Sequence, residues 1–477
     1  MLLPWSERAH RGVTSDEIPT GTWMCPRRSR TLIAACLGAV IGAVGTADLA
    51  AQETLRSALS QQLVSQFQPD RPTAFVTPSS QLIQQFQRAL QPALLNVGPF
   101  RGALSAGLGV SWDDNANLTN IDRQSEVRFS QSLGLSLNWP LSYLNQIGVQ
   151  LGATLTEVAT SGKANTQQTG VTSNNQAFDI SIQPGTNISF QFIAGDVLVG
   201  VHDYLSVLQD PTQDPSVANQ SALGRVTNDV GASALWNLDR LLLGATFDYS
   251  YSSDEESTLT SGARNTFRPG VSAAFSLSPQ VSTGLDATYI NSSATGSGTL
   301  NAIAVGPFFR GQITHAIGVD AQAGLYYISA SNTPVNGFPS PSIPSTDYYL
   351  SLAISHQITR SIQYLISFSR DINFSAGNDL SETNSFTLGA GWTLGRGVGL
   401  SVGGLANWGK VLSGEFPGPF TQYGAHVQLG WSPSRHIQTS LSYEFLVRNG
   451  TGSTGDINGV GASYKQNRVD LTLSYNF

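Results

Sequence analysis

Charged side chains recur along this chain on the polar side of segments in which polar and apolar residues alternate. Residues two apart on a β-strand share a face, so these side chains would gather on one face of a sheet. The residues expected there are Arg128, Asp179, Asp229, Asp248, Arg268, Asp286, Arg310, Asp320, His426, Glu444, Arg448, Arg468 and Asp470. Along an aqueous passage, such charges select ions by their electric field. Seven of the twelve charged residues are acidic, so the pattern predicts a weak preference for cations.

The same charges have a structural interpretation that stays open at this point. Opposite charges facing each other across two strands stabilise the sheet and fix its register. Arg310 and Asp320 are equidistant from His315 in a short turn, so they are expected to face each other. Glu444 and Arg468 are expected to meet in the same way across the last hairpin.

The histidines do not indicate catalysis. His202 and His426 are expected on the polar face of distant strands, and the side chains of His202 and Asp203 should point to opposite faces. A nucleophile, base and orienting group are not visible together, so we predict no enzyme activity and no cofactor or metal. An acidic loop tip at residues 254–256, Asp-Glu-Glu, would either bind a divalent cation through oxygen ligands or remain solvated.

Strand periodicity dominates the chain from about residue 104 to its end. The terminal stretch RVDLTLSYNF places Val469, Leu471, Leu473, Tyr475 and Phe477 on one face. Similar alternation recurs upstream and gives about 18 strands. Short connections such as NLDR, THA and SRH alternate with long ones such as SGKANTQQTGVTSNNQ. Short turns on one side and long loops on the other are typical of outer-membrane barrels.

The apolar face of these strands is expected to meet lipid, because the opposite face is too polar for a core. Aromatic residues are expected at both membrane interfaces. They are Trp139, Phe192, Trp236, Trp392, Trp431 and Tyr475 on the turn side, and Trp112, Tyr251, Tyr289 and Trp408 on the loop side. The predicted fold class is all-β: a transmembrane antiparallel up-and-down β-barrel of about 18 strands, with a short helical N-terminal periplasmic segment.

The first 51 residues have the layout of an export signal. Arginines precede the apolar stretch LIAACLGAVIGAVGTA, and small residues follow it. Cleavage after Ala47 or Ala51 fits, and translation is expected to start at Met24. Both cysteines, Cys25 and Cys36, lie in this part, so a disulfide framework is not expected in the mature chain. Without residues 1–51 the net charge is −8, which disfavours nucleic-acid binding.

Residues 52–98 have helical spacing, with leucines and phenylalanines four apart. They are predicted to form a periplasmic helical or linker segment, or else to enter the barrel and narrow it. The barrel itself is assigned to residues 99–477.

Two motifs resemble known families. The terminal strand with Tyr475 and Phe477 is similar to the recognition signal of the barrel-assembly machinery of Gram-negative outer membranes. The stretch VSWDDNANLT, with Asp113, Asp114 and Asn115, resembles the β-barrel porin type 2 family over residues 104–477. The resemblance implies a porin-like or surface-polysaccharide-associated barrel.

The leading functional hypothesis is passive diffusion of small hydrophilic solutes through an outer-membrane barrel. Two alternatives remain: a structural or adhesive barrel whose loops bind glycan, and an outlet for exported polysaccharide. A closed lumen would implicate residues 52–98 or an infolded loop at Asp210–Arg225. Outer-membrane lipid, the barrel-assembly machinery and a second copy of the chain are the expected partners.

Overall fold

The computed structural model describes the chain from residue 95 onward, with gaps. The described residues are 95–98, 100–116, 118, 123–142, 145–160, 178–208, 225–254, 263–278, 280–294, 298–331, 345–374, 380–395, 397–412, 418–434, 436–450 and 463–477. Residues 1–94, which contain the expected signal and the expected helices, lie outside these ranges. The loop at residues 210–224 lies outside them as well. No helix in the described part of the chain is long and apolar enough to cross a membrane.

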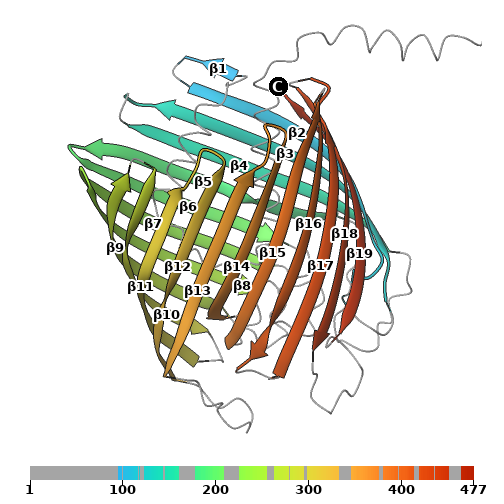
Figure 1. Cartoon of the computed structure of the whole chain (residues 1–477). Helices are drawn as coiled ribbons and strands as arrows, with labels where there is room; N and C mark the ends of the chain where they lie inside the picture. Colours follow the sequence, from blue (N-terminus) through green and yellow to red (C-terminus); the bar gives the residue numbers. More distant parts are fainter. Residues whose placement is uncertain are drawn as a thin grey trace, which may run out of the picture. The chain divides into compact units, whose positions relative to one another are not determined.

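The described residues form nineteen β-strands (Figure 1). They are β1 (Leu95–Val97), β2 (Phe100–Asp113), β3 (Glu126–Pro140), β4 (Gln146–Thr160), β5 (Phe178–Ala194), β6 (Val197–Leu208), β7 (Arg225–Leu238), β8 (Leu241–Asp254), β9 (Arg264–Ser278), β10 (Val281–Ala294), β11 (Gly298–Gln312), β12 (Ile317–Ser331), β13 (Thr346–Gln357), β14 (Ile362–Phe374), β15 (Leu380–Gly395), β16 (Val398–Val411), β17 (Gly418–Trp431), β18 (Ile437–Gly450) and β19 (Tyr464–Asn476).

Strands β2 to β19 close into one antiparallel ring. Each strand pairs with the next along the chain, and β19 pairs with β2, so the last strand lies beside the first (Figure 1). The short strand β1 pairs only with the start of β2, through a turn at Gly98. The expected all-β barrel is confirmed, and its ring contains 18 strands. An even number of strands brings the two ends of the ring to the same side.

Alternation of side chains explains why these segments become strands of a ring. On β17, Tyr423 and Trp431 are about half exposed, whereas Gln422, His426 and Gln428 on the other face are buried. The outer face is therefore apolar and open, and the inner face is polar and covered. Because the ring is closed, its backbone donors and acceptors pair along the whole sheet, which a hydrocarbon environment requires.

The outer face carries the aromatic residues expected at the membrane interfaces. Trp236, Trp392 and Trp431 lie near the short turns and are 47–50% exposed, and Trp112 and Trp408 lie near the long loops and are 40–43% exposed. The turn between β7 and β8 is tight, with Asp239 at a φ of 61°. Positive φ values match the twist of a two-residue hairpin turn. Such turns fix the register of neighbouring strands.

The seam where β19 meets β2 is held by the motif that suggested a family resemblance. The carboxylate of Asp114 accepts hydrogen bonds from the backbone N–H and the side-chain amide of Asn467, each at 2.6 Å. Asp113 accepts one from the amide of Gln466 at 2.6 Å. Asn115 donates from Nδ2 to a backbone carbonyl of β19 at 2.8 Å. The Asp-Asp-Asn group thus joins the first strand of the ring to the last.

Candidate functional site

The inner wall of the ring is the candidate site. Alternation places the following predicted residues on the face opposite the exposed apolar side chains: Arg128, Asp229, Asp248, Arg268, Asp286, Arg310, Asp320, His426, Glu444, Arg448, Arg468 and Asp470. Asp179 lies on β5 opposite Thr156 of β4, and its side chain lies outside the described part. Sequence reasoning did not include the inward acids Asp113 and Glu126, which end β2 and begin β3.

Several inner charges pair with a neighbour on the wall. Arg310 faces Asp320 in the register and donates from Nε to its carboxylate at 2.7 Å, which confirms that prediction. Glu444 also faces Arg468 in the register. However, the Nε of Arg468 donates at 2.9 Å to Asp470, two residues along its own strand. These pairs stabilise the sheet and reduce the field that an ion in the lumen would meet.

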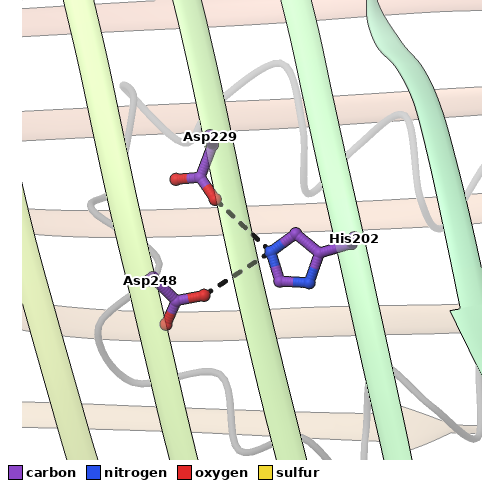
Figure 2. A group of neighbouring side chains, drawn as sticks. All are labelled: His202, Asp229 and Asp248. Carbon is purple, nitrogen blue, oxygen red and sulfur yellow. Dashed lines mark hydrogen bonds and ion pairs between the residues drawn. The ribbon is translucent and has the colours of Figure 1, made fainter.

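Three inward side chains from three consecutive strands converge on one point. His202 of β6 places its Nε2 atom 3.4 Å from an oxygen of Asp229 on β7 and 3.5 Å from an oxygen of Asp248 on β8. Figure 2 shows the imidazole ring turned towards both carboxylates. The three side chains are 21–25% exposed. We call this group the His202 cluster; sequence reasoning placed each member on the polar face but did not bring them together.

A glycine allows the cluster to form. His202 lies opposite Gly231 across β6 and β7, and Gly231 lies opposite Asp248 across β7 and β8. A methyl group at position 231 would overlap both the ring of His202 and a carboxylate oxygen of Asp248. His202 can therefore reach across β7 only because position 231 has no side chain. The ring of Tyr204 lies 4.9 Å from that of His202, measured between centroids.

Arg268 on β9 extends the charged region. Its position faces Asp248 across β8 and β9, and its guanidinium lies in the field of Asp229, Asp248 and Asp371. Its Nε atom is buried and has no hydrogen-bond partner among the described residues. Asp371 in turn accepts a hydrogen bond from the hydroxyl of Tyr326 at 2.5 Å. This part of the wall carries opposite charges close together without a full set of hydrogen bonds.

Asp286 on β10 is a second charged group held apart from solvent. It is 8% exposed, and its carboxylate oxygens have no hydrogen-bond partner of ordinary geometry in the described ranges.

The inner wall is not polar throughout. A buried apolar cluster includes the inward residues Ile290, Leu300, Ala302, Ala304, Tyr326, Ile328 and Tyr349 of β10 to β13. The rings of Tyr326 and Tyr349 lie 5.1 Å apart, measured between centroids. Gly306 and Gly324 leave the space over which the Tyr349 ring lies. Small residues on neighbouring strands thus let large aromatic groups lie along the wall.

Leu118, in the segment that follows β2, packs against inward side chains of the ring. Leu118 has a φ of 47° and is 6% exposed, in a buried cluster with the inward residues Leu446 of β18 and Tyr464 of β19. Leu405 of β16 packs against this cluster. Two segments are expected to narrow the lumen, residues 52–98 and the loop at residues 210–225. Of these, the structure describes only residues 95–98 and Arg225. Sequence reasoning did not predict the inward position of Leu118.

The outer face also carries a few charges. Asp203 points away from His202, as expected, and accepts a hydrogen bond from the amide of Asn228 at 2.7 Å on the outer surface. Arg370 of β14 forms ion pairs with Asp347 at 2.7 Å and with Glu382 at 3.0 Å. Asp203 is therefore partnered on the outer surface. Arg370 is partnered too, but the side chains of its ion pairs are only 9–18% exposed, and Asp347 lies opposite the inward Tyr326 in the register.

Comparisons with known proteins identify similar barrels but no family. No family model matches the chain, and no curated protein matches it significantly. OpdQ of Pseudomonas aeruginosa is 10% identical, with a TM-score of 0.43 over 80% of this chain and 99% of that chain. OccAB3 of Acinetobacter baumannii is 10% identical, with a TM-score of 0.46 over 80% of this chain and all of that chain. Identities near 10% and TM-scores below 0.5 do not show a shared family or solute, so the resemblance to the β-barrel porin type 2 family stays a prediction.

Proposed function

We propose that this protein is an outer-membrane pore through which small hydrophilic solutes diffuse passively. The observation that carries the proposal is the closed ring of 18 strands with an apolar outer face and a charged inner face. Barrels of 16 to 18 strands are wide enough to enclose an aqueous channel. An inner wall with histidine, aspartate and arginine side chains suits passage of polar solutes and ions.

The inner charges support a weak preference for cations. Acidic residues are the majority of the predicted set, and Asp113 and Glu126 add to them near the loop side. Pairing reduces the effective number, since Arg310 and Arg468 each bind a neighbouring carboxylate. The inward loop at Leu118 would narrow the entrance on the side of β16 to β19. The preference for cations is therefore expected to be modest.

The ends of the chain support a periplasmic N-terminal segment and recognition by the barrel-assembly machinery. With an even strand count, both ends of the ring lie on the side of the short turns, which faces the periplasm in such barrels. Phe477 donates its backbone N–H to the carbonyl of Leu104 at 2.8 Å, and its ring lies 4.8 Å from that of Tyr475, measured between centroids. The terminal aromatic pair thus lies where the last strand of the ring meets the first. Association with a second copy of the chain also belongs to this proposal.

A structural or adhesive barrel and a polysaccharide outlet are the rival functions. The buried apolar cluster on β10 to β13 and the Leu118 loop favour a restricted lumen. Permeability separates the alternatives: the full chain, purified in detergent from the membrane fraction, is reconstituted into liposomes that are then diluted into sugars of increasing size. The pore predicts swelling with small sugars that falls off with size. Intact, correctly folded barrels that give no swelling with any sugar would overturn the proposal.

A further inference from the structure

We infer that the His202 cluster is a binding site for a divalent transition-metal ion of the Zn²⁺ type on the inner wall of the barrel. The cluster consists of His202, Asp229 and Asp248, from β6, β7 and β8. Each side chain offers one ligand atom, and the three atoms lie within 4.8 Å of one another. The inference concerns binding and does not depend on the barrel being open.

Two of the three separations within the cluster match the edge of a small coordination tetrahedron. Nitrogen and oxygen ligands lie about 2.1 Å from Zn²⁺ in tetrahedral sites, so two such ligands are about 3.4 Å apart. The Nε2 atom of His202 lies 3.4 Å from an oxygen of Asp229 and 3.5 Å from an oxygen of Asp248. One ion can therefore be reached by all three atoms once the two carboxylate oxygens, which lie within 4.8 Å of each other, take up the spacing of the coordination shell.

The donor set selects the class of ion. Imidazole nitrogen suits zinc, copper, iron and nickel, whereas magnesium and calcium favour sites made of oxygen alone. Two carboxylates and one neutral imidazole would place a charge of −2 around a divalent cation. The side chains are 21–25% exposed, so the site is open to the lumen. Three protein ligands leave a fourth position that water or a solute can occupy.

Two neighbouring residues, Gly231 and Arg268, are expected to change the affinity of the site for a cation in opposite directions. Gly231 leaves the room in which the ring of His202 meets Asp248. Arg268 acts electrostatically on both Asp229 and Asp248, so its positive charge competes with a bound cation. The rival arrangement is an imidazolium held between the two carboxylates as an ion pair. The two arrangements differ in their response to removal of Arg268, because only a metal site should bind Zn²⁺ more tightly without it.

Equilibrium dialysis against Zn²⁺ tests the site. The full chain, without a histidine tag, is purified in detergent from the membrane fraction, and bound zinc is measured by mass spectrometry. We expect one specific Zn²⁺ per chain, not displaced by excess Mg²⁺. His202→Ala and Asp248→Asn should each weaken binding by roughly 10- to 100-fold or more, since even changes outside the ligand set cost that much. Asp203→Asn is the matched control, because Asp203 neighbours His202 but faces outward, and it should leave binding unchanged.

Two further variants keep all three ligands. Gly231→Ala should weaken binding by separating His202 from Asp248. Arg268→Gln should strengthen it by about threefold or more, because a nearby positive charge is removed. Circular dichroism of the β-sheet verifies folding of each variant. Equal zinc binding by the wild type and His202→Ala, or weaker binding by a folded Arg268→Gln variant, would overturn the inference.

Discussion

Two parts of the inner wall have the same strand alternation but differ in the exposure and bonding of their inward side chains. The seam wall comprises the inward faces of β16 to β19 and β2, and the cluster wall comprises those of β6 to β9. On the seam wall, Asn407 donates to Gln422 at 2.8 Å, and Gln422 donates to Tyr464 at 3.3 Å. These amides are 1% exposed, whereas the members of the His202 cluster are 21–25% exposed. The amide groups of the seam wall are thus buried and hydrogen-bonded to their neighbours, whereas the charged members of the His202 cluster remain partly exposed.

The largest expected effect belongs to the seam itself, where the end of β2 meets β19. Asp114→Ala removes two charge-assisted hydrogen bonds to Asn467. Bonds of this kind contribute about 1.5–3 kcal/mol each, so we expect the free energy of unfolding to fall by about 3 kcal/mol. Urea unfolding of the reconstituted barrel, followed by tryptophan fluorescence, measures it. Asp203→Asn, on the outer face, is the control. A loss at Asp114 no larger than that at Asp203 would mean that the bonds between the end of β2 and β19 contribute no special stability.

The inward loop of the seam wall should have the next largest effect. Leu118→Ala shortens a side chain that is 6% exposed and clusters with Leu446 and Tyr464. Truncating a buried leucine typically costs 2–5 kcal/mol, and a loop position should lie near about 2 kcal/mol. Because the loop enters the ring, the single-channel current should rise as well. Loss of stability with unchanged current would mean that the loop does not border the solute path.

On the cluster wall, charge should alter selectivity more than stability. Asp229→Asn with Asp248→Asn removes two negative charges from a region open to the lumen. The reversal potential in a salt gradient should shift towards anions, because the local field loses its negative sources. The matched control is Asp203→Asn, which removes a charge from the outer face. If both changes shift the reversal potential equally, the cluster wall does not line the path of ions.

The smallest effect is expected for a pair that belongs to neither wall. Arg310 and Asp320 form a 2.7 Å ion pair, but the side chain of Asp320 is 44% exposed. Exposed pairs contribute about 0.2–1 kcal/mol in double-mutant cycles. A cycle of Arg310→Ala and Asp320→Ala should give a coupling in that range. A coupling as large as the loss of unfolding free energy in Asp114→Ala would contradict the expectation that the junction of β2 with β19 contributes more to stability than this exposed pair.

The difference between the walls also explains what the sequence could predict. Alternation is local, so the strands and the side on which Asp229 and Asp248 lie follow from it. Tight turns also make the register of two neighbouring strands predictable. The turn at Asp239 places Gly231 opposite Asp248, and the turn at His315 places Arg310 opposite Asp320. The register of His202 against Gly231 does not follow, because residues 209–224 connect β6 to β7 and such a long loop fixes no register.

The seam is the other relationship that sequence could not supply. Asp114 and Asn467 are 353 residues apart, and they meet only because 18 strands bring the last beside the first. The Asp-Asp-Asn group suggested a resemblance but not its role in closing the ring. Likewise, nothing in the spacing of Leu118 indicated that its loop turns inward, because loops follow no periodicity.

Single-channel recording in a planar bilayer tests the central claim most directly. The full chain, purified in detergent and inserted at high dilution, is held under a salt gradient, and conductance and reversal potential are recorded together. The account predicts stable, reproducible openings with a modest preference for cations, lost on heat denaturation. Folded barrels that insert but remain silent would contradict it and would favour a structural barrel.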